Sequence, residues 1–123
     1  MDVIHICLNV SDADDLAQWY MENLGFEYSW EFTSEDGETR NVYVADSNGI
    51  ELQLSDTDGE DDFEAGTAYD HLAVSVDDVD EAFAEIDHHG VVQEPADNTA
   101  AGARTAFVED PDGHVVELVQ PME

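Results

Sequence analysis

The sequence predicts an α+β fold made of two successive modules, each with the element order strand, helix, three strands. Apolar and polar residues alternate with a period of two in several short segments, and two longer segments have helical spacing. The stretches VIHICLNVSDADD and YDHLAVSVDDVDE also resemble each other. We therefore expect a single domain over residues 1–123, in which two repeats, 1–54 and 69–121, are joined by a linker at 55–68.

The first module begins with the strand VIHICLNV. Every second residue from Ile4 to Val10 is apolar and is expected to face the core, while His5 lies on the other face. Ser11 is the expected N-cap of a helix that ends at Gly25. The segments FEYSWEF, RNVYVAD and IELQL then supply three strands, with a hairpin turn at SEDGET.

The second module repeats this order. A strand over 70–76 carries His71, and a helix over 78–89 is ended by Gly90. A short strand, VVQEP, is followed by the loop ADNTAAGA and by the strands RTAFVED and VVELV, which are joined by the turn PDGH.

Net charge is the most unusual property of the composition. Aspartate and glutamate total 32 against two cationic side chains, Arg40 and Arg104, which gives a formal net charge of −30. Such a surface repels nucleic acids and anionic membranes, so neither is an expected partner. The acids are interleaved with 42% hydrophobic residues, a pattern typical of a folded protein. We expect adaptation to a salt-rich, halophilic cytoplasm; an acidic protein of an ordinary cell is the alternative.

Cysteine usage and the absence of targeting signals bear on the compartment. The single cysteine, Cys7, excludes an internal disulfide and a cysteine-based zinc motif, and its position in a strand predicts a buried, inert thiol. Nothing resembles a signal peptide or a membrane span, so we expect a cytoplasmic protein.

Each module carries one histidine in its first strand and one glutamate in its last strand. His5 and Glu51 are 46 residues apart, and so are His71 and Glu117. A glutamate in a strand with apolar alternation needs a compensating charge, which convergence of all four side chains on one cation provides. Imidazole and carboxylate ligands without thiolates suit Ni²⁺, Co²⁺, Zn²⁺ or Mn²⁺. The alternative is that each of the four residues faces solvent on an exposed sheet.

Several of these motifs resemble the glyoxalase, or vicinal oxygen chelate, superfamily, which also includes bleomycin resistance proteins and dioxygenases. AFVEDPDGHVVEL is similar to the superfamily signature, and GTAYDHLAVSVDD resembles the glyoxalase I (lactoylglutathione lyase) branch. The resemblance implies that two βαβββ modules form a curved, open, mixed sheet, and that a histidine and a glutamate of each module bind a metal. Together with the acidic composition, it suggests a halophilic archaeal type.

The resemblance also implies an activity. Glyoxalase I isomerises the hemithioacetal of methylglyoxal and a small thiol to a lactoyl thioester, which detoxifies methylglyoxal. Carried over by position, Glu117 is the catalytic base, Glu51 can serve the opposite stereoisomer, and the metal ligands are His5, Glu51, His71 and Glu117. The short chain is similar to the type that prefers Ni²⁺ or Co²⁺, with one ion per site. The family also implies a homodimer in which two chains share each site.

Two departures from the family pattern concern the thiol. The family has an arginine four positions after the first histidine, where this chain has Asn9, and SDTDG replaces a segment that often offers an asparagine to glutathione. We therefore expect γ-glutamylcysteine, the thiol associated with salt-loving archaea. Asn9 and Arg104 are the candidate substrate-binding residues, and relief of local acidity at the surface is the alternative role of Arg104.

Other members of the superfamily supply the competing functions. An extradiol-type dioxygenase, a coenzyme-A epimerase and a non-catalytic protein that sequesters a small molecule are alternatives to the lyase. Dioxygenases resemble a two-histidine, one-carboxylate iron site, so a fourth ligand argues against them. Sequestering proteins commonly lack the full ligand set.

Overall fold

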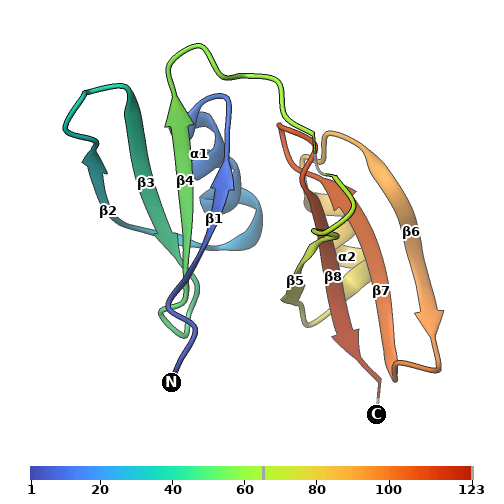
Figure 1. Cartoon of the computed structure of the whole chain (residues 1–123). Coiled ribbons are helices and arrows are strands. Elements are labelled where there is room, and N and C mark those ends of the chain that lie inside the picture. Colours follow the sequence, from blue (N-terminus) through green and yellow to red (C-terminus); the bar gives the residue numbers. More distant parts are fainter. Residues whose placement is uncertain (65, 123) are drawn as a thin grey trace. The chain divides into compact units, whose positions relative to one another are not determined.

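The computed structural model describes residues 1–64 and 66–122, which form two compact units. Both units have the order strand, helix, three strands, so the predicted α+β class and the two βαβββ modules are confirmed (Figure 1). The first unit, residues 1–64, contains β1 (His5–Asn9), α1 (Ala13–Leu24), β2 (Glu27–Thr33), β3 (Thr39–Ala45) and β4 (Glu51–Thr57). The second unit, residues 66–122, contains β5 (Leu72–Ser75), α2 (Val79–Glu85), β6 (Val91–Asn98), β7 (Ala103–Glu109) and β8 (Val115–Pro121).

Each unit is built on a four-stranded mixed sheet in which the first strand lies beside the last. The strand order is β1-β4-β3-β2 in the first sheet and β5-β8-β7-β6 in the second. The pairs β1–β4 and β5–β8 are parallel, whereas the other neighbours are antiparallel. A parallel pair requires a crossover connection, and in each unit the helix and the two following strands supply it.

One face of each sheet packs against the helix of the same unit (Figure 1). Alternate residues of the two central strands point to this face and are buried there, as the pleat of a strand requires. Full burial of such a side chain contributes about 1.5–3 kcal/mol. In the first unit the buried strand residues are Val42, Val44, Leu52 and Leu54, and in the second they are Ala106, Val108, Val116 and Leu118.

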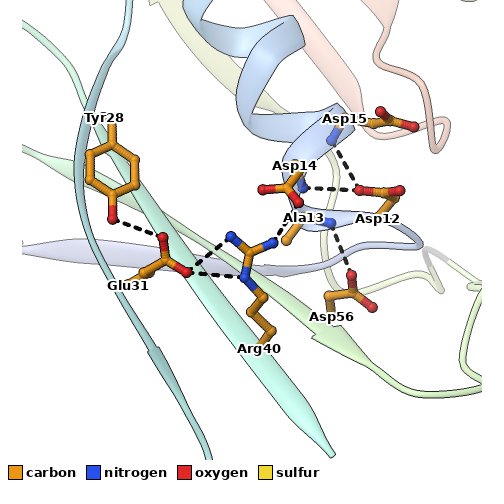
Figure 2. Close-up of polar contacts among 8 residues, drawn as sticks. All are labelled: Asp12, Ala13, Asp14, Asp15, Tyr28, Glu31, Arg40 and Asp56. Carbon is orange, nitrogen blue, oxygen red and sulfur yellow. Dashed lines mark hydrogen bonds and ion pairs between the residues drawn. The ribbon is translucent and has the colours of Figure 1, made fainter.

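The first helix begins and ends at residues with clear capping geometry. The Asp12 carboxylate accepts hydrogen bonds from the N–H groups of Asp14 (3.0 Å) and Asp15 (3.1 Å), so the N-cap is Asp12 and not the predicted Ser11 (Figure 2). The helix ends at the predicted Gly25, whose φ of 72° favours glycine. No helix in residues 1–64 or 66–122 is long and apolar enough to cross a membrane.

The second helix is shorter than the sequence predicts, because it ends at Glu85 instead of near residue 89. The N–H of His89 donates to the carbonyl of Glu109, and the N–H of Glu109 donates to the carbonyl of Gly90, both at 2.9 Å. His89 and Gly90 therefore hydrogen-bond to β7 and do not continue the helix. Their backbone groups are satisfied by β7 and are no longer available to a helix.

Other element boundaries also differ from the prediction. β5 begins at Leu72, which places His71 immediately before the strand, and β6 continues to Asn98 through a segment predicted as a loop. Pairing with β7, with two register irregularities, holds that segment extended. Ile4 and Ile6 are exposed and not in the core, because α1 packs mainly over β3 and β4.

Polar contacts fasten α1 to the sheet of the first unit. Arg40 of β3 binds Asp14 in the first turn of the helix (2.6 Å) and Glu31 of the edge strand β2 (2.9 Å) (Figure 2). The Asp56 carboxylate of β4 accepts a hydrogen bond from the N–H of Ala13 (3.0 Å). These contacts therefore connect the start of the helix to the strands β2, β3 and β4.

The second unit repeats these contacts with other residues. Arg104 of β7 binds Asp80 in the first turn of α2 (2.8 Å) and Asp97 of the edge strand β6 (3.0 Å). The side-chain oxygen of Gln120 on β8 accepts a hydrogen bond from the N–H of Val79 (2.9 Å). Each of the two arginines in the chain thus lies on the helix-covered face of its sheet.

We expect folding to weaken sharply when KCl is lowered from molar to millimolar concentration. The two arginines already bind acidic side chains, so the other carboxylates repel one another. Lower salt lengthens the screening distance from about 3 Å at 1 M to about 30 Å at 10 mM. Circular dichroism melts across a KCl series measure the effect, with sucrose in low salt as the non-ionic control. Equal thermal midpoints across the series would contradict this expectation.

Candidate metal centre and active site

The predicted histidines and glutamates lie on the face of each sheet opposite the helix, which we call the site face. Directly paired residues of neighbouring strands point to the same face, so the strand register defines rows of side chains across it. One row of the first unit contains Cys7, Gln53, Tyr43 and Trp30, and one row of the second contains Ala73, Glu117, Phe107 and Gln93.

In the second unit, His71 and Glu117 are in contact. Nε2 of His71 lies 3.1 Å from Oε1 of Glu117, and Nδ1 of the same ring lies 2.6 Å from Oδ1 of Asp70. The ring packs edge-on against Phe107, with the ring centroids 5.2 Å apart. The hydrogen bond with Asp70, aided by the charge of Glu117, raises the pKa of His71. The side chains of His71 and Glu117 are 30% and 17% exposed, so a ligand can reach both.

This contact fits one half of a divalent metal site. Two ligand atoms at right angles, each about 2.1 Å from an ion, lie about 3 Å apart, close to the separation found between His71 and Glu117. Asp70 holds the other ring nitrogen, as carboxylates commonly do for metal-binding histidines. Within residues 1–64 and 66–122, no group of three or more His, Cys, Asp or Glu side chains is placed to hold an ion. Of the four predicted ligands, the structure brings His71 and Glu117 into contact.

The corresponding pair of the first unit is arranged differently. His5 and Glu51 are direct neighbours in the parallel β1–β4 pairing. However, the Glu51 carboxylate accepts a hydrogen bond from the hydroxyl of Ser29 on β2. Because β1 and β2 lie on opposite sides of β4, this bond draws the Glu51 side chain away from His5. His5 instead packs edge-on against Tyr43, with ring centroids 5.7 Å apart.

Gln53 is a residue of the site face that the sequence argument did not single out. It follows Glu51 by two positions, so the pleat places both side chains on the same face. Its Nε2 donates a hydrogen bond to Oδ1 of Asn41 (2.9 Å) on β3. The alternation in IELQL contains this signal, because it sets two polar residues on one face of the strand.

Aromatic side chains cover the adjoining part of the site face in the first unit. Trp30 stacks on Tyr43 with ring centroids 4.5 Å apart and on Phe32 with centroids 5.4 Å apart. Trp30 and Phe32 are 46% and 41% exposed, whereas Tyr43 is buried. Burial raises the pKa of Tyr43, so its phenol stays protonated at neutral pH. These rings supply an apolar surface next to His5.

The remaining predicted residues do not all lie on the site face. Asn9 does, in the row after that of Cys7. Arg104 lies on the helix-covered face with acidic partners, so the structure does not bring it together with His71 and Glu117. Cys7 is exposed and not buried as predicted, because it lies on the site face, which the helix does not cover. Partial desolvation raises the pKa of Cys7, which disfavours the reactive thiolate.

Comparison with solved structures places this architecture among known proteins. Glyoxalase I from Zea mays matches 98% of this chain with a TM-score of 0.86 at 24% identity, and this chain spans 45% of the maize chain. The trypanothione-dependent glyoxalase I of Leishmania major matches 98% of this chain and 86% of its own, with a TM-score of 0.82 at 27% identity. TnmS3, an antibiotic binding protein from Streptomyces, matches 98% of this chain and 96% of its own, with a TM-score of 0.74 at 27% identity.

Comparison of sequences gives the family. A protein named lactoylglutathione lyase from Haemophilus influenzae is 32% identical over 127 residues, which cover 98% of this chain and 93% of that protein. Residues 3–118 match the family model described as Glyoxalase/Bleomycin resistance protein/Dioxygenase superfamily. With the two βαβββ units and the paired histidine and glutamate already described, these matches show that the chain belongs to the glyoxalase/bleomycin resistance protein/dioxygenase superfamily.

Proposed function

We propose that this protein is a metal-dependent lyase of the glyoxalase I type, which converts the hemithioacetal of methylglyoxal and a small thiol into a lactoyl thioester. The contact between His71 and Glu117, with Asp70 bound to the other nitrogen of the ring, is the observation that carries the proposal. Relatives named lactoylglutathione lyase, matched over nearly the whole chain, support the same reaction.

The proposed site holds one divalent ion. His5, His71 and Glu117 supply three ligands, and an oxygen of β4, for which the sequence predicts Glu51, supplies the fourth. Nitrogen and oxygen ligands without a thiolate suit Ni²⁺ or Co²⁺, with Zn²⁺ and Mn²⁺ as alternatives. When bound, the ion supplies Lewis-acid stabilisation of the negative charge that develops on the substrate oxygens.

Glu117 is the proposed catalytic base. The reaction moves a proton from the carbon next to a carbonyl group to the neighbouring carbon, so one carboxylate can accept the proton and return it. The contact with His71 fixes the position of the Glu117 carboxylate, and Phe107 is its direct neighbour on β7. This aromatic neighbour excludes water on one side and so protects the proton from exchange during transfer.

The thiol of the substrate is proposed to be γ-glutamylcysteine, in a protein of a salt-rich cytoplasm. Asn9 lies on the site face at the position where the family pattern has an arginine. An amide can hydrogen-bond to a carboxylate but cannot neutralise it, which weakens the case for glutathione. Both arginines are engaged on the helix-covered faces, so neither supplies the missing charge.

A sequestering protein without catalysis is the second candidate, because the chain is also similar to the antibiotic binding protein TnmS3. The exposed rings of Trp30 and Phe32 would suit an apolar ligand in that case. However, sequestration requires no imidazole and carboxylate in contact. Metal analysis of the purified protein distinguishes the two candidates, because only the lyase requires the ion.

Glu117→Gln is expected to lower turnover by about a hundredfold or more, because the amide cannot accept the proton. Thioester formation from methylglyoxal and thiol, followed by absorbance with Ni²⁺ or Co²⁺ present, measures this loss. Glu94→Gln, the same change at an exposed position of β6, is the matched control and should keep full activity. A Glu117→Gln variant that retains most of its turnover would show that another group is the base.

The two thiols should be turned over with different efficiency. We expect kcat/KM to be higher for the hemithioacetal of γ-glutamylcysteine than for that of glutathione. Asn9→Arg restores the charge of the family pattern and should raise kcat/KM for glutathione through a lower KM. Steady-state kinetics of both proteins with both hemithioacetals test this expectation. Equal values for the wild-type protein, or a preference for glutathione, would refute the thiol assignment.

The protein is further proposed to be a homodimer in which one chain contributes the ligands of its first unit and its partner those of the second. His5→Ala and the double variant His71→Ala with Glu117→Gln should each be inactive. After mixed refolding, random pairing leaves one intact site in half of the dimers, so about a quarter of wild-type activity should return. Confirmed heterodimers without activity would show that each chain completes its own site.

A further inference from the structure

Matching hydrogen bonds in the two units determine which residues of β4 and β8 are equivalent. At the end of each parallel strand pair, the N–H of Val10 donates to the carbonyl of Ser55, and the N–H of Val76 donates to the carbonyl of Val119, both at 2.9 Å. The acceptors are therefore equivalent positions. The residues two positions before these acceptors are Gln53 and Glu117.

The turns that precede the two strands give the same correspondence. The N–H of Asp46 donates to the carbonyl of Ile50, and the N–H of Asp110 donates to the carbonyl of His114, both at 2.9 Å. Each turn has a glycine with positive φ one residue before the acceptor. The residues that follow these turns, and that are therefore equivalent, are Glu51 and Val115.

The histidines confirm that the first strands are also in register. His5 and His71 each precede the valine donor of their own strand by five residues. Both rings pack edge-on against an aromatic residue, with interplanar angles of 83° for Tyr43 and 87° for Phe107. On the neighbouring strand, the direct partners of these two aromatic residues are Gln53 and Glu117, respectively.

The hydrogen bonds of β4 orient Gln53 differently from Glu51. Nε2 of Gln53 donates to Oδ1 of Asn41, a residue that is only 4% exposed, so the amide oxygen of Gln53 is the atom left to accept or to coordinate. The Glu51 carboxylate is instead bound by Ser29 on β2, on the side of β4 that faces away from His5. Asn41 thus has the positioning role for Gln53 that partners of metal ligands commonly have.

We infer that Gln53, and not Glu51, is the oxygen ligand that the first unit contributes to the divalent ion, with Asn41 as its positioning residue. The inference rests on the proposed function and deepens it, because it replaces the fourth ligand that the sequence predicts. The ligand set becomes two imidazoles, one carboxylate and one neutral amide.

The neutral ligand has two chemical consequences. An amide oxygen carries no formal charge, so the ion and its four ligands together keep one positive charge instead of none. An amide also accepts no proton, so Glu117 is the one ligand able to act as a base, and the enzyme should process one stereoisomer of the hemithioacetal. This consequence removes the role that the family resemblance implies for Glu51, which is to convert the opposite stereoisomer.

Binding of Co²⁺ to the metal-free protein tests the ligand assignment without reference to turnover. Isothermal titration and the visible absorption spectrum of Co²⁺ are measured for the wild type, Gln53→Leu, Gln53→Glu and Glu51→Gln. We expect Gln53→Leu to lose about tenfold or more in affinity, Gln53→Glu to bind more tightly with an altered spectrum, and Glu51→Gln to stay within about twofold of the wild type. Gln18→Leu, the same change at an exposed site on α1, is the matched control.

Each outcome of these titrations decides for or against the inference. Wild-type affinity in Gln53→Leu, an unchanged spectrum in Gln53→Glu, or a loss in Glu51→Gln as large as that in Gln53→Leu overturns it. Gln53→Glu keeps the shape of the side chain, so it provides the test if Gln53→Leu fails to fold. If the proposed function is wrong but the ligand assignment is right, the Gln53 variants change Co²⁺ binding as expected, and no thiol yields a thioester. A wild-type protein that binds no divalent ion contradicts both.

Discussion

The parallel pairing of the first and last strands of each unit is the constraint on which both proposed half-sites depend. It brings a histidine from the beginning of the unit next to a strand that the chain reaches only after a helix and two more strands. The antiparallel neighbours then add an aromatic residue, Tyr43 or Phe107, to the same row. If either parallel pair shifted by one residue, the histidine would point to the helix-covered face.

The two faces of each sheet have separate physical roles. Buried apolar residues and the contacts of Arg40 and Arg104 hold the helix against one face. The opposite face carries the imidazoles, the carboxylate and the stacked rings of Trp30 and Tyr43. Because stability derives mainly from the helix-covered face, polar groups that contribute little to the core can be retained on the site face.

Alternation and turn residues in the sequence are sufficient to predict the fold class, the duplication and the face of each strand that bears polar groups. They do not determine register across the sheet. Between the histidine and the following turn, the first unit has two residues more than the second, and between the turn and the glutamate it has two fewer. The equal spacing of 46 residues therefore suggests that Glu51 is the equivalent of Glu117. The strand register shows instead that Gln53 is the equivalent of Glu117. A shift of two residues leaves the face unchanged, so periodicity cannot detect it.

The same limit applies to the arginines, whose pairing with helix residues no periodic pattern reveals. Arg40 and Arg104 are the two lysine or arginine residues of the sequence, and both are bound on the helix-covered faces. No lysine or arginine is therefore left for the site face. A substrate that carries carboxylates would then approach a strongly negative protein whose main local positive charge is the proposed ion. Replacement of one carboxylate ligand by the amide of Gln53 leaves more of that positive charge uncompensated. A neutral ligand is therefore consistent with the proposed lyase, whose proposed thiol substrate is anionic, and high salt would support the same binding by screening the remaining repulsion.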